Sequence, residues 1–373
     1  MKSAKFLFAL MLCLIFSGFT SNLNAQQEKT KVFLITLDGL RWQELFTGVD
    51  SVLVHTKSFT SNPKQLEEFM SPTSVQEKRA SLMPFVWNSV VKMGTVYGNR
   101  HFQNKVNLTN KMWFSYPGYN EILTGKADDE RITSNSKINN PNVTVLEEYQ
   151  QIAKRPYASA AFGSWDVFPF IVNEERSGVY VNAGFEPANH QALSPEERLL
   201  NDLQQQVPSP WSTVRLDGFT HQYAKAFIKK YHPDLVYIAY GETDDFAHNG
   251  NYEAYIKATH NTDALLKELW ELTQNEDFYR DQTLFIITTD HGRGTVPIES
   301  WKSHGASVSG ADQTWIMIYG AGVEPQGELE NQEQFYANQI APTIRKIMGL
   351  ENKGVDQGFG KALDIGLNHT NQQ

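Results

Sequence analysis

The sequence predicts an α/β fold: a doubly wound, mostly parallel central sheet flanked by helices, with inserted cap segments. Three stretches carry this prediction, at residues 31–37, 234–240 and 285–289. Each is apolar or β-branched almost throughout, which is typical of strands that are buried on both faces. Each also runs into acidic residues close to a glycine, and ligands bind at the carboxyl ends of such strands. The sequence therefore points to a site at one edge of the sheet.

Residues 1–25 have the pattern of a secretory signal. Lys2 and Lys5 precede an apolar run at 6–16, and residues 23–25, Leu-Asn-Ala, form a suitable cleavage site. The run is too short for a confident membrane span. We therefore expect a secreted or periplasmic protein without a stable membrane span.

Composition limits the chemistry. The only cysteine, Cys13, lies in the predicted signal, so a mature chain has no thiolate and must bind any metal through His, carboxylate or hydroxyl groups. The net charge of -9 argues against binding to a nucleic-acid polymer, because phosphate backbones recruit basic surfaces. A small anionic substrate is still compatible. We expect residues 26–373 to form one domain, with caps near 42–83 and 155–215.

In the first half of the chain, the strand at 31–37 ends at Asp38 and Gly39, where the acid is either a turn former or a ligand. Pro117 suits the first turn of a helix that ends at Gly125. Ser115 then lies just before that helix. It is either a simple N-cap, or a nucleophile facing an anion at the positive end of the helix dipole.

After residue 142, helices are predicted near 143–152, 196–206, 216–231, 251–272 and 340–349, and strands at 157–162, 234–240 and 313–319. After the strand at 234–240, Asp244 and His248 are four residues apart. On a helical turn they project from one face, which suits metal ligation; the alternative is an exposed acidic turn. Asp290 and His291 follow the strand at 285–289, and His304 lies in the next loop.

These groups comprise three carboxylates, three imidazoles and one hydroxyl. Nitrogen and oxygen donors in this ratio suit zinc or another borderline divalent ion. Seven groups exceed the needs of one tetrahedral ion, whereas two ions roughly 3.5–4 Å apart would use them all. The predicted set is Asp38, Ser115, Asp244, His248, Asp290, His291 and His304.

The order and spacing of these motifs resemble the alkaline phosphatase superfamily, in particular its nucleotide pyrophosphatase/phosphodiesterase branch. The resemblance rests on the segments 37–39, 115–117 with 123–125, 244–248, 289–292, 304–305 and 340–344, so it spans nearly all of the mature chain.

The resemblance implies two zinc ions and a small phosphorylated substrate. One zinc would bind Asp38, Asp290 and His291 and touch Ser115, and the other would bind Asp244, His248 and His304. Ser115 would be the nucleophile and would form a phospho-serine. An Asn about twenty residues further on would hold a phosphoryl oxygen; we predict Asn135, although ungapped spacing points to Ser136.

The sequence also departs from the pattern. The phosphodiesterase members carry Thr where this chain has Ser115. The sulfatase branch needs Arg where this chain has Tyr119, which makes a sulfatase less favoured. No pair of cations matches the Lys-x-Arg of some monoesterases, so diesters are favoured; Arg293 and Lys302 are the nearest substitutes.

Three alternatives stay open besides the phosphodiesterase/phosphatase: a sulfatase-like hydrolase, a phosphoglycerate mutase-like phosphotransferase, and an exported glycan-binding module without catalysis. The predicted signal argues against the mutase, whose substrate is cytoplasmic. Trp165 and Phe168 are candidate stacking surfaces for the leaving group, or ordinary core residues.

Overall fold

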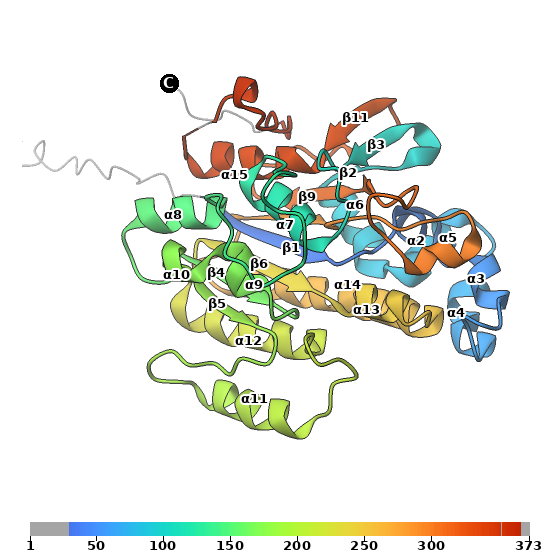
Figure 1. Cartoon of the computed structure of the whole chain (residues 1–373), viewed down its shortest axis with the longest axis horizontal. Helices are drawn as coiled ribbons and strands as arrows, with labels where there is room; N and C mark the ends of the chain where they lie inside the picture. The colour runs from blue at the N-terminus through green and yellow to red at the C-terminus, as the bar shows by residue number, and fades with distance from the viewer. Residues whose placement is uncertain (1–29, 352, 367–373) are drawn as a thin grey trace, which may run out of the picture.

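The computed structural model describes residues 30–351 and 353–366, so the signal predicted at 1–25 lies outside the described residues. Its centre is an eight-stranded sheet in the order β10-β2-β9-β7-β1-β6-β4-β5 (Figure 1). Among the described residues, no helix is both long and apolar enough to cross a membrane. The strands of the sheet are β1 (Lys31–Leu37), β2 (Gly94–Tyr97), β4 (Ser159–Gly163), β5 (Tyr180–Ala183), β6 (Leu235–Tyr240), β7 (Thr283–Thr288), β9 (Ile316–Gly320) and β10 (Gly327–Glu328).

The sheet is mostly parallel, which confirms the predicted fold class. β1 pairs in parallel with β6 and β7, and β4 in parallel with β6 and β5. Only β9 runs antiparallel to its neighbours β7 and β2. Because β1, β6 and β7 share one direction, the residues that follow them meet at one edge.

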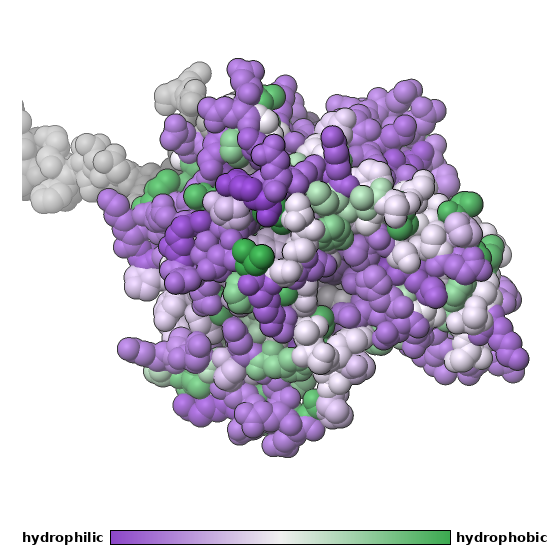
Figure 2. Space-filling view, viewed as in Figure 1, coloured by the Kyte–Doolittle hydropathy of each residue, from purple (hydrophilic) through white to green (hydrophobic). Residues whose placement is uncertain are grey.

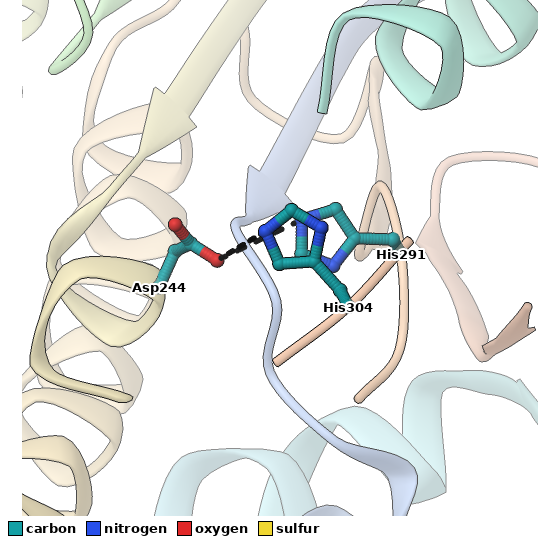
Figure 3. A group of neighbouring side chains, drawn as sticks. All are labelled: Asp244, His291 and His304. Carbon is teal, nitrogen blue, oxygen red and sulfur yellow. Dashed lines mark ion pairs between the residues drawn. The ribbon is translucent and has the colours of Figure 1, made fainter. Parts of the chain in front are cut away.

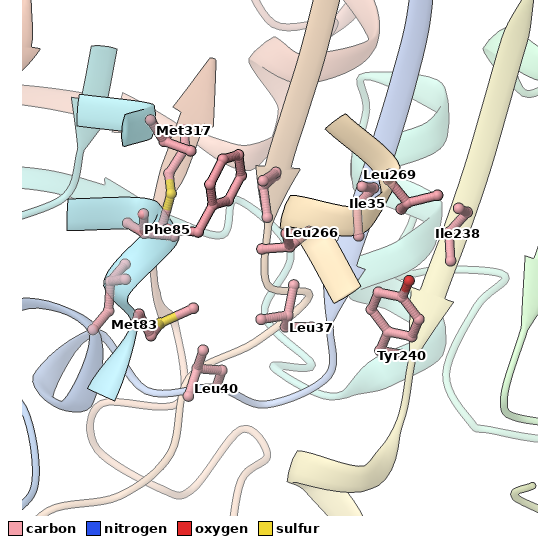
Figure 4. Close-up of a cluster of buried hydrophobic side chains, with 14 of the residues drawn as sticks. Ile35, Leu37, Leu40, Met83, Phe85, Ile238, Tyr240, Leu266, Leu269 and Met317 are labelled. Carbon is pink, nitrogen blue, oxygen red and sulfur yellow. The ribbon is translucent and has the colours of Figure 1, made fainter. Parts of the chain in front are cut away.

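Both faces of the sheet are buried. Phe33, Ile35 and Leu37 point into one hydrophobic cluster with α12 (Asp217–Tyr231) and α14 (Tyr252–Asn275). Val32 and Leu34 point into the other, which contains the helices α7 (Ser115–Thr124), α8 (Val145–Ala153) and α15 (Ile340–Met348). Figure 4 shows part of the first cluster, where Leu266 and Leu269 of α14 lie against Ile35 and Ile238. Burial on both faces explains the uninterrupted apolar runs.

The two predicted cap segments differ. Residues 42–83 form short helices whose apolar side chains join the cluster around α14. Residues 155–215 include β4 and β5, which belong to the central sheet, so only the remainder lies outside it. The helices of these two segments are α2 (Trp42–Thr47), α3 (Ser51–His55), α4 (Glu67–Met70), α5 (Val75–Leu82), α9 (Phe168–Val172), α10 (Glu174–Ser177) and α11 (Pro195–Gln206).

A second, three-stranded sheet lies beside the β10–β2 edge (Figure 1). In it, β3 (Asn104–Asn107) pairs in parallel with β11 (Glu333–Tyr336) and antiparallel with β8 (Gln313–Thr314). The expected single strand at 313–319 is thus divided between two sheets at Trp315, whose indole Nε1 donates to the Leu40 carbonyl (2.9 Å).

The start of α7 is fixed by buried polar contacts. The Glu121 carboxylate accepts hydrogen bonds from the backbone N–H and side chain of both Thr109 and Asn110 (2.8–2.9 Å). Asn110 Oδ1 in turn accepts from the Trp113 N–H (3.0 Å), and Trp113 has a left-handed φ of 52°. Glu121 therefore holds the strained turn that delivers the chain to Ser115.

We expect Glu121→Ala to lower the free energy of unfolding by about 3 kcal/mol, because it leaves four donors, two buried on Asn110 and two half-buried on Thr109, without their acceptor. Urea unfolding of the mature protein measures this. Glu130→Ala is the control: this glutamate is exposed, and its removal should change stability by less than about 0.5 kcal/mol. Equal stability of the two variants would contradict the role of Glu121.

Candidate metal centre

The seven predicted groups come from five places in the fold. Asp38 follows β1, and Asp290 and His291 follow β7. Asp244 and His248 lie on α13 (Glu242–His248) directly after β6, which confirms the expected helical turn. The last two groups are His304, in the loop after the 3₁₀ turn Ile298–Lys302, and Ser115, which is the first residue of α7 rather than its N-cap.

His291 lies at the centre of the first group. Its Nε2 atom is 3.3 Å from Asp38 Oδ1, 3.5 Å from Asp290 Oδ2 and 3.3 Å from Ser115 Oγ. Ligand atoms of a tetrahedral zinc ion lie roughly 3.3–3.4 Å apart, given Zn–N and Zn–O distances of about 2.0–2.1 Å. Asp38 Oδ1 and Asp290 Oδ2 are buried without a hydrogen-bond partner among the described residues. The chemistry of these donors, their spacing and the two carboxylate oxygens without a hydrogen-bond partner all fit a bound metal ion.

A second group adjoins the first and shares His291. Ligand atoms of Asp244, His291 and His304 lie within 4.8 Å of one another. Figure 3 shows the two imidazoles side by side, both facing the Asp244 carboxylate that comes from α13; the Nε2 atom of each is 3.7 Å from Asp244 Oδ1. His248, which the resemblance places here, lies 3.2 Å from Asp244 Oδ2 and 2.9 Å from His304 Nε2.

Electrostatics also favours a cation. Burial and the charge of Asp38 raise the pKa of Asp290 well above its usual range. Burial would also raise the pKa of Asp38, but contacts with His291 outweigh it and lower the pKa. Burial would lower the pKa of His291, whereas Asp290 and Asp38 raise it to about 9. Two acids thus compete for one imidazolium, and added positive charge would relieve their repulsion.

Neighbouring groups orient the first set of donors. The Tyr119 hydroxyl donates to Asp38 Oδ2 (2.7 Å), and the Gly39 N–H donates to Asp290 Oδ1 (3.1 Å). At Gly118, a Cβ atom would lie 2.3 Å from the Asp290 carbonyl oxygen, so only glycine allows α7 to approach this closely. Contacts of this kind fix ligand geometry.

Arg293 connects the two groups. Arg293 is buried, and its guanidinium donates to the backbone carbonyls of Gly39 (3.1 Å) and Lys302 (2.8 Å). It also donates to Asp244, to both the backbone carbonyl (3.1 Å) and the side-chain carboxylate of that residue. These hydrogen bonds link the loop after β1, the end of the 3₁₀ turn Ile298–Lys302 and helix α13, so Arg293 is a support for Asp244. Lys302 lies with its ammonium 5.9 Å from the Phe59 ring centre.

Asn135 contacts the residue that follows Ser115. Asn135 Oδ1 accepts from the Tyr116 N–H (3.0 Å), one residue after Ser115, while the Ser136 N–H donates to Ser134 Oγ. Asn135 is exposed, and its amide N–H groups have no protein partner among the described residues. Asn135, and not Ser136, is thus the residue that contacts the backbone beside Ser115.

Of the two candidate stacking residues, Phe168 belongs to the core. It is 2% exposed and packs edge-to-face on Tyr119 (4.8 Å between ring centres). Trp165 is half-buried. Sequence reasoning missed Tyr119, Asn110 and Glu121 as supports; the one available signal was the spacing of Tyr119, four residues after Ser115 on the same helix.

The comparisons agree with a metal site. Residues 199–352, less than half of the chain, match the family model of the Metalloenzyme superfamily. A segment of 118 residues is 27% identical to 2,3-bisphosphoglycerate-independent phosphoglycerate mutase from Helicobacter pylori, covering 32% of this chain. It spans 22% of that relative, about a fifth of its length.

Solved structures resemble nearly the whole chain. Wild-type alkaline phosphatase PafA has a TM-score of 0.56 at 12% identity, covering 89% of this chain and 99% of that one. A putative sulfatase from Bacteroides thetaiotaomicron has a TM-score of 0.56 at 12% identity, and the match covers 93% of this chain and 76% of that one. The lipoteichoic acid synthase LtaP from Listeria monocytogenes has a TM-score of 0.55 at 12% identity, and the match covers 91% of this chain and 76% of that one. The chain thus has an alkaline phosphatase-like α/β fold, and at these identities the likeness shows the fold alone.

We expect Arg293→Met to weaken metal binding about 10- to 100-fold, because Asp244 loses the contact that orients it. Competition with a chelator, followed by metal analysis of the dialysed protein, measures the affinity. Arg280→Met, which removes an exposed arginine paired with Asp277, is the control and should bind metal normally. Unchanged affinity in Arg293→Met would show that the guanidinium does not support the site.

Proposed function

We propose that this protein is an exported, metal-dependent phosphoester hydrolase of the phosphodiesterase/phosphatase type, related to the nucleotide pyrophosphatase branch. The observation that carries the proposal is the position of Ser115 Oγ, 3.3 Å from His291 Nε2 and at the N-terminus of a ten-residue helix. A hydroxyl so placed shares its surroundings with the metal donors and with the positive end of the helix.

Asp38, Asp290 and His291 would hold one divalent ion, and Asp244 and His304, with His248 beside them, the other; zinc suits these donors best. When bound, the ions lower the pKa of a neighbouring hydroxyl and neutralise charge on a phosphoryl group. The protein supplies the rest of the reaction.

Ser115 Oγ forms a bond to phosphorus while the bond to the leaving-group oxygen breaks, giving a phospho-serine. Water then attacks the same phosphorus and releases Ser115. The Asn135 amide donates to a non-bridging phosphoryl oxygen, a contact that strengthens as charge develops there.

Diesters are the favoured substrates. A monoester carries a second negative charge, and Arg293 is committed to Asp244 and to backbone carbonyls instead of the anion. A sulfatase is less favoured, since Tyr119 replaces the expected Arg and donates to Asp38 instead. A panel of p-nitrophenyl phosphate, its bis-ester and p-nitrophenyl sulfate separates these activities.

A phosphotransferase is the second candidate, because the segment similar to the mutase is 27% identical over 118 residues. A coupled assay for interconversion of phosphoglycerates decides between the two. Mutase activity without release of inorganic phosphate would replace hydrolysis as the function.

Ser115→Ala should lower kcat on bis-p-nitrophenyl phosphate by a factor on the order of 10³ or more, since no other group replaces the nucleophile. Metal content should not change. Ser115→Thr is the matched control, because it keeps a hydroxyl, and it should retain measurable activity. Chelation should abolish wild-type activity, and added Zn²⁺ should restore it. Full activity of Ser115→Ala, or of the chelated enzyme, would refute the mechanism.

Asn135→Ala should lower kcat/KM by about 10²-fold through loss of a donor to the phosphoryl group. Ser136→Ala tests the neighbouring position and should be nearly neutral. Both residues are exposed, so both variants should fold. If Ser136→Ala lost activity and Asn135→Ala did not, the assignment would move to Ser136.

A further inference from the structure

Helix α11 lies at the outside of the structure, and Figure 1 shows α12 between it and the central sheet. The two fully buried residues of α11, Glu197 and Gln204, are polar, whereas Leu199 and Leu203 are 57% and 37% exposed. A surface helix normally turns its apolar stripe to the core and its polar face to water. In α11 this arrangement is reversed.

Polar contacts hold the inner side of α11 in place. The Gln204 side chain donates to the Phe185 carbonyl (2.8 Å). The Glu197 carboxylate accepts from the Ser194 N–H (2.7 Å) and pairs with His190. Because a rotation of α11 that buried its leucines would break these bonds, the apolar side of the helix stays outward.

The outer side of α11 carries an apolar stripe. Leu199, Leu203 and Val207 follow one another at intervals of four residues, so they lie on one side of the helix. Val207, the C-cap residue, is 39% exposed. Figure 2 shows hydrophobic surface, in green, among the hydrophilic side chains over α11 and α12. Single exposed apolar residues are common, but a row of three on a reversed helix indicates a surface that an apolar partner covers.

A groove of about 440 Å³ between α11 and α12 adjoins this stripe. Leu199 belongs to both, and Leu200 and Ala226 complete the apolar part of the groove. None of the proposed metal ligands lines it, so it is separate from the site described above. The charged lining residues are Lys225, Lys229, Lys230 and Glu196. Three cations and one acid thus border the groove, in a chain whose net charge is -9.

The lysines give the groove a positive rim. Lys225 pairs with Glu268 (2.6 Å), and the Lys230 ammonium donates to a backbone carbonyl. Lys229 is exposed and forms no hydrogen bond or salt bridge among the described residues. Glu196 is the one acid among the described lining residues, and a single carboxylate does not offset both Lys229 and Lys230.

The apolar stripe and the positive rim together point to one kind of partner. A small apolar ligand would fill the groove but leave Leu203 and Val207 exposed, since neither lines it. A second copy of the chain would bring the same lysines to the interface, because a two-fold contact joins a patch to itself. An anionic bilayer supplies an apolar phase for the leucines and phosphate groups for the lysines at the same time.

We propose that α11 and the adjoining groove form a peripheral membrane contact, which binds the surface of bilayers that contain anionic phospholipid. Leu199, Leu203 and Val207 enter the boundary between headgroups and acyl chains, while Lys229 and Lys230 contact phosphate groups. The contact is reversible, because three apolar side chains and two cations bind more weakly than a spanning helix. The proposal goes beyond phosphoester hydrolysis and does not depend on it.

The test is co-sedimentation of the mature protein with vesicles of phosphatidylcholine, either alone or mixed with phosphatidylglycerol. We expect binding to the mixed vesicles that weakens with added salt, and at least about fivefold weaker binding to the neutral ones. The double variant Leu199→Gln/Leu203→Gln should reduce binding to mixed vesicles about tenfold or more. Val52→Gln/Val75→Gln, which changes exposed valines of α3 and α5, is the matched control and should bind like the wild type.

Lys229→Gln should weaken binding to mixed vesicles about fivefold, and Lys57→Gln, which removes another exposed lysine, is its control. All four variants change exposed side chains, so their circular dichroism should match the wild type. Absence of binding to mixed vesicles, equal binding by the leucine and valine double variants, or equal binding by the two lysine variants would each overturn the proposal. A dimer in light scattering that the leucine double variant dissociates would also overturn it, because a second copy would then cover the stripe.

Discussion

The whole site depends on two buried carboxylates that share one imidazole. Asp38 and Asp290 are both almost completely buried, and both lie within 3.5 Å of His291 Nε2. Burying two like charges side by side is costly unless positive charge lies between them. Strands β1 and β7 are parallel neighbours, so Asp38 and Asp290, which follow them, lie close together at the same edge of the sheet. A bound cation would offset the repulsion between the two carboxylates.

The remaining structure restrains this centre from three sides. Gly118 lets α7 approach Asp290, and the Glu121–Asn110 contacts hold the strained turn before Ser115. Arg293 ties the loops after β1 and β7 to α13. These contacts hold Ser115 and the candidate metal donors in fixed positions.

The fold alone does not select the chemistry. Solved structures that resemble the chain include an alkaline phosphatase, a lipoteichoic acid synthase and a putative sulfatase, each at 12% identity. What separates such proteins is the set of groups around the reacting atom. In this chain the candidate groups are Ser115 as the proposed nucleophile, Asn135, which contacts the Tyr116 N–H, and Tyr119, which donates to the candidate ligand Asp38. The proposal of phosphoryl transfer over sulfate-ester hydrolysis rests on these three residues.

The sequence by itself determined the central strands β1, β6 and β7, the doubly wound fold class, the motif residues that follow these strands and the helix that ends at Gly125, because burial on both faces and turn chemistry are local properties. Only the tertiary structure decided which groups meet. It placed His291 between both groups of donors and paired Arg293 with Asp244 and with backbone carbonyls. It also assigned β4 and β5 to the central sheet instead of a cap. These outcomes depend on contacts between residues far apart in the chain, such as Asp38 and Asp290. A local sequence pattern does not specify which distant residues come into contact.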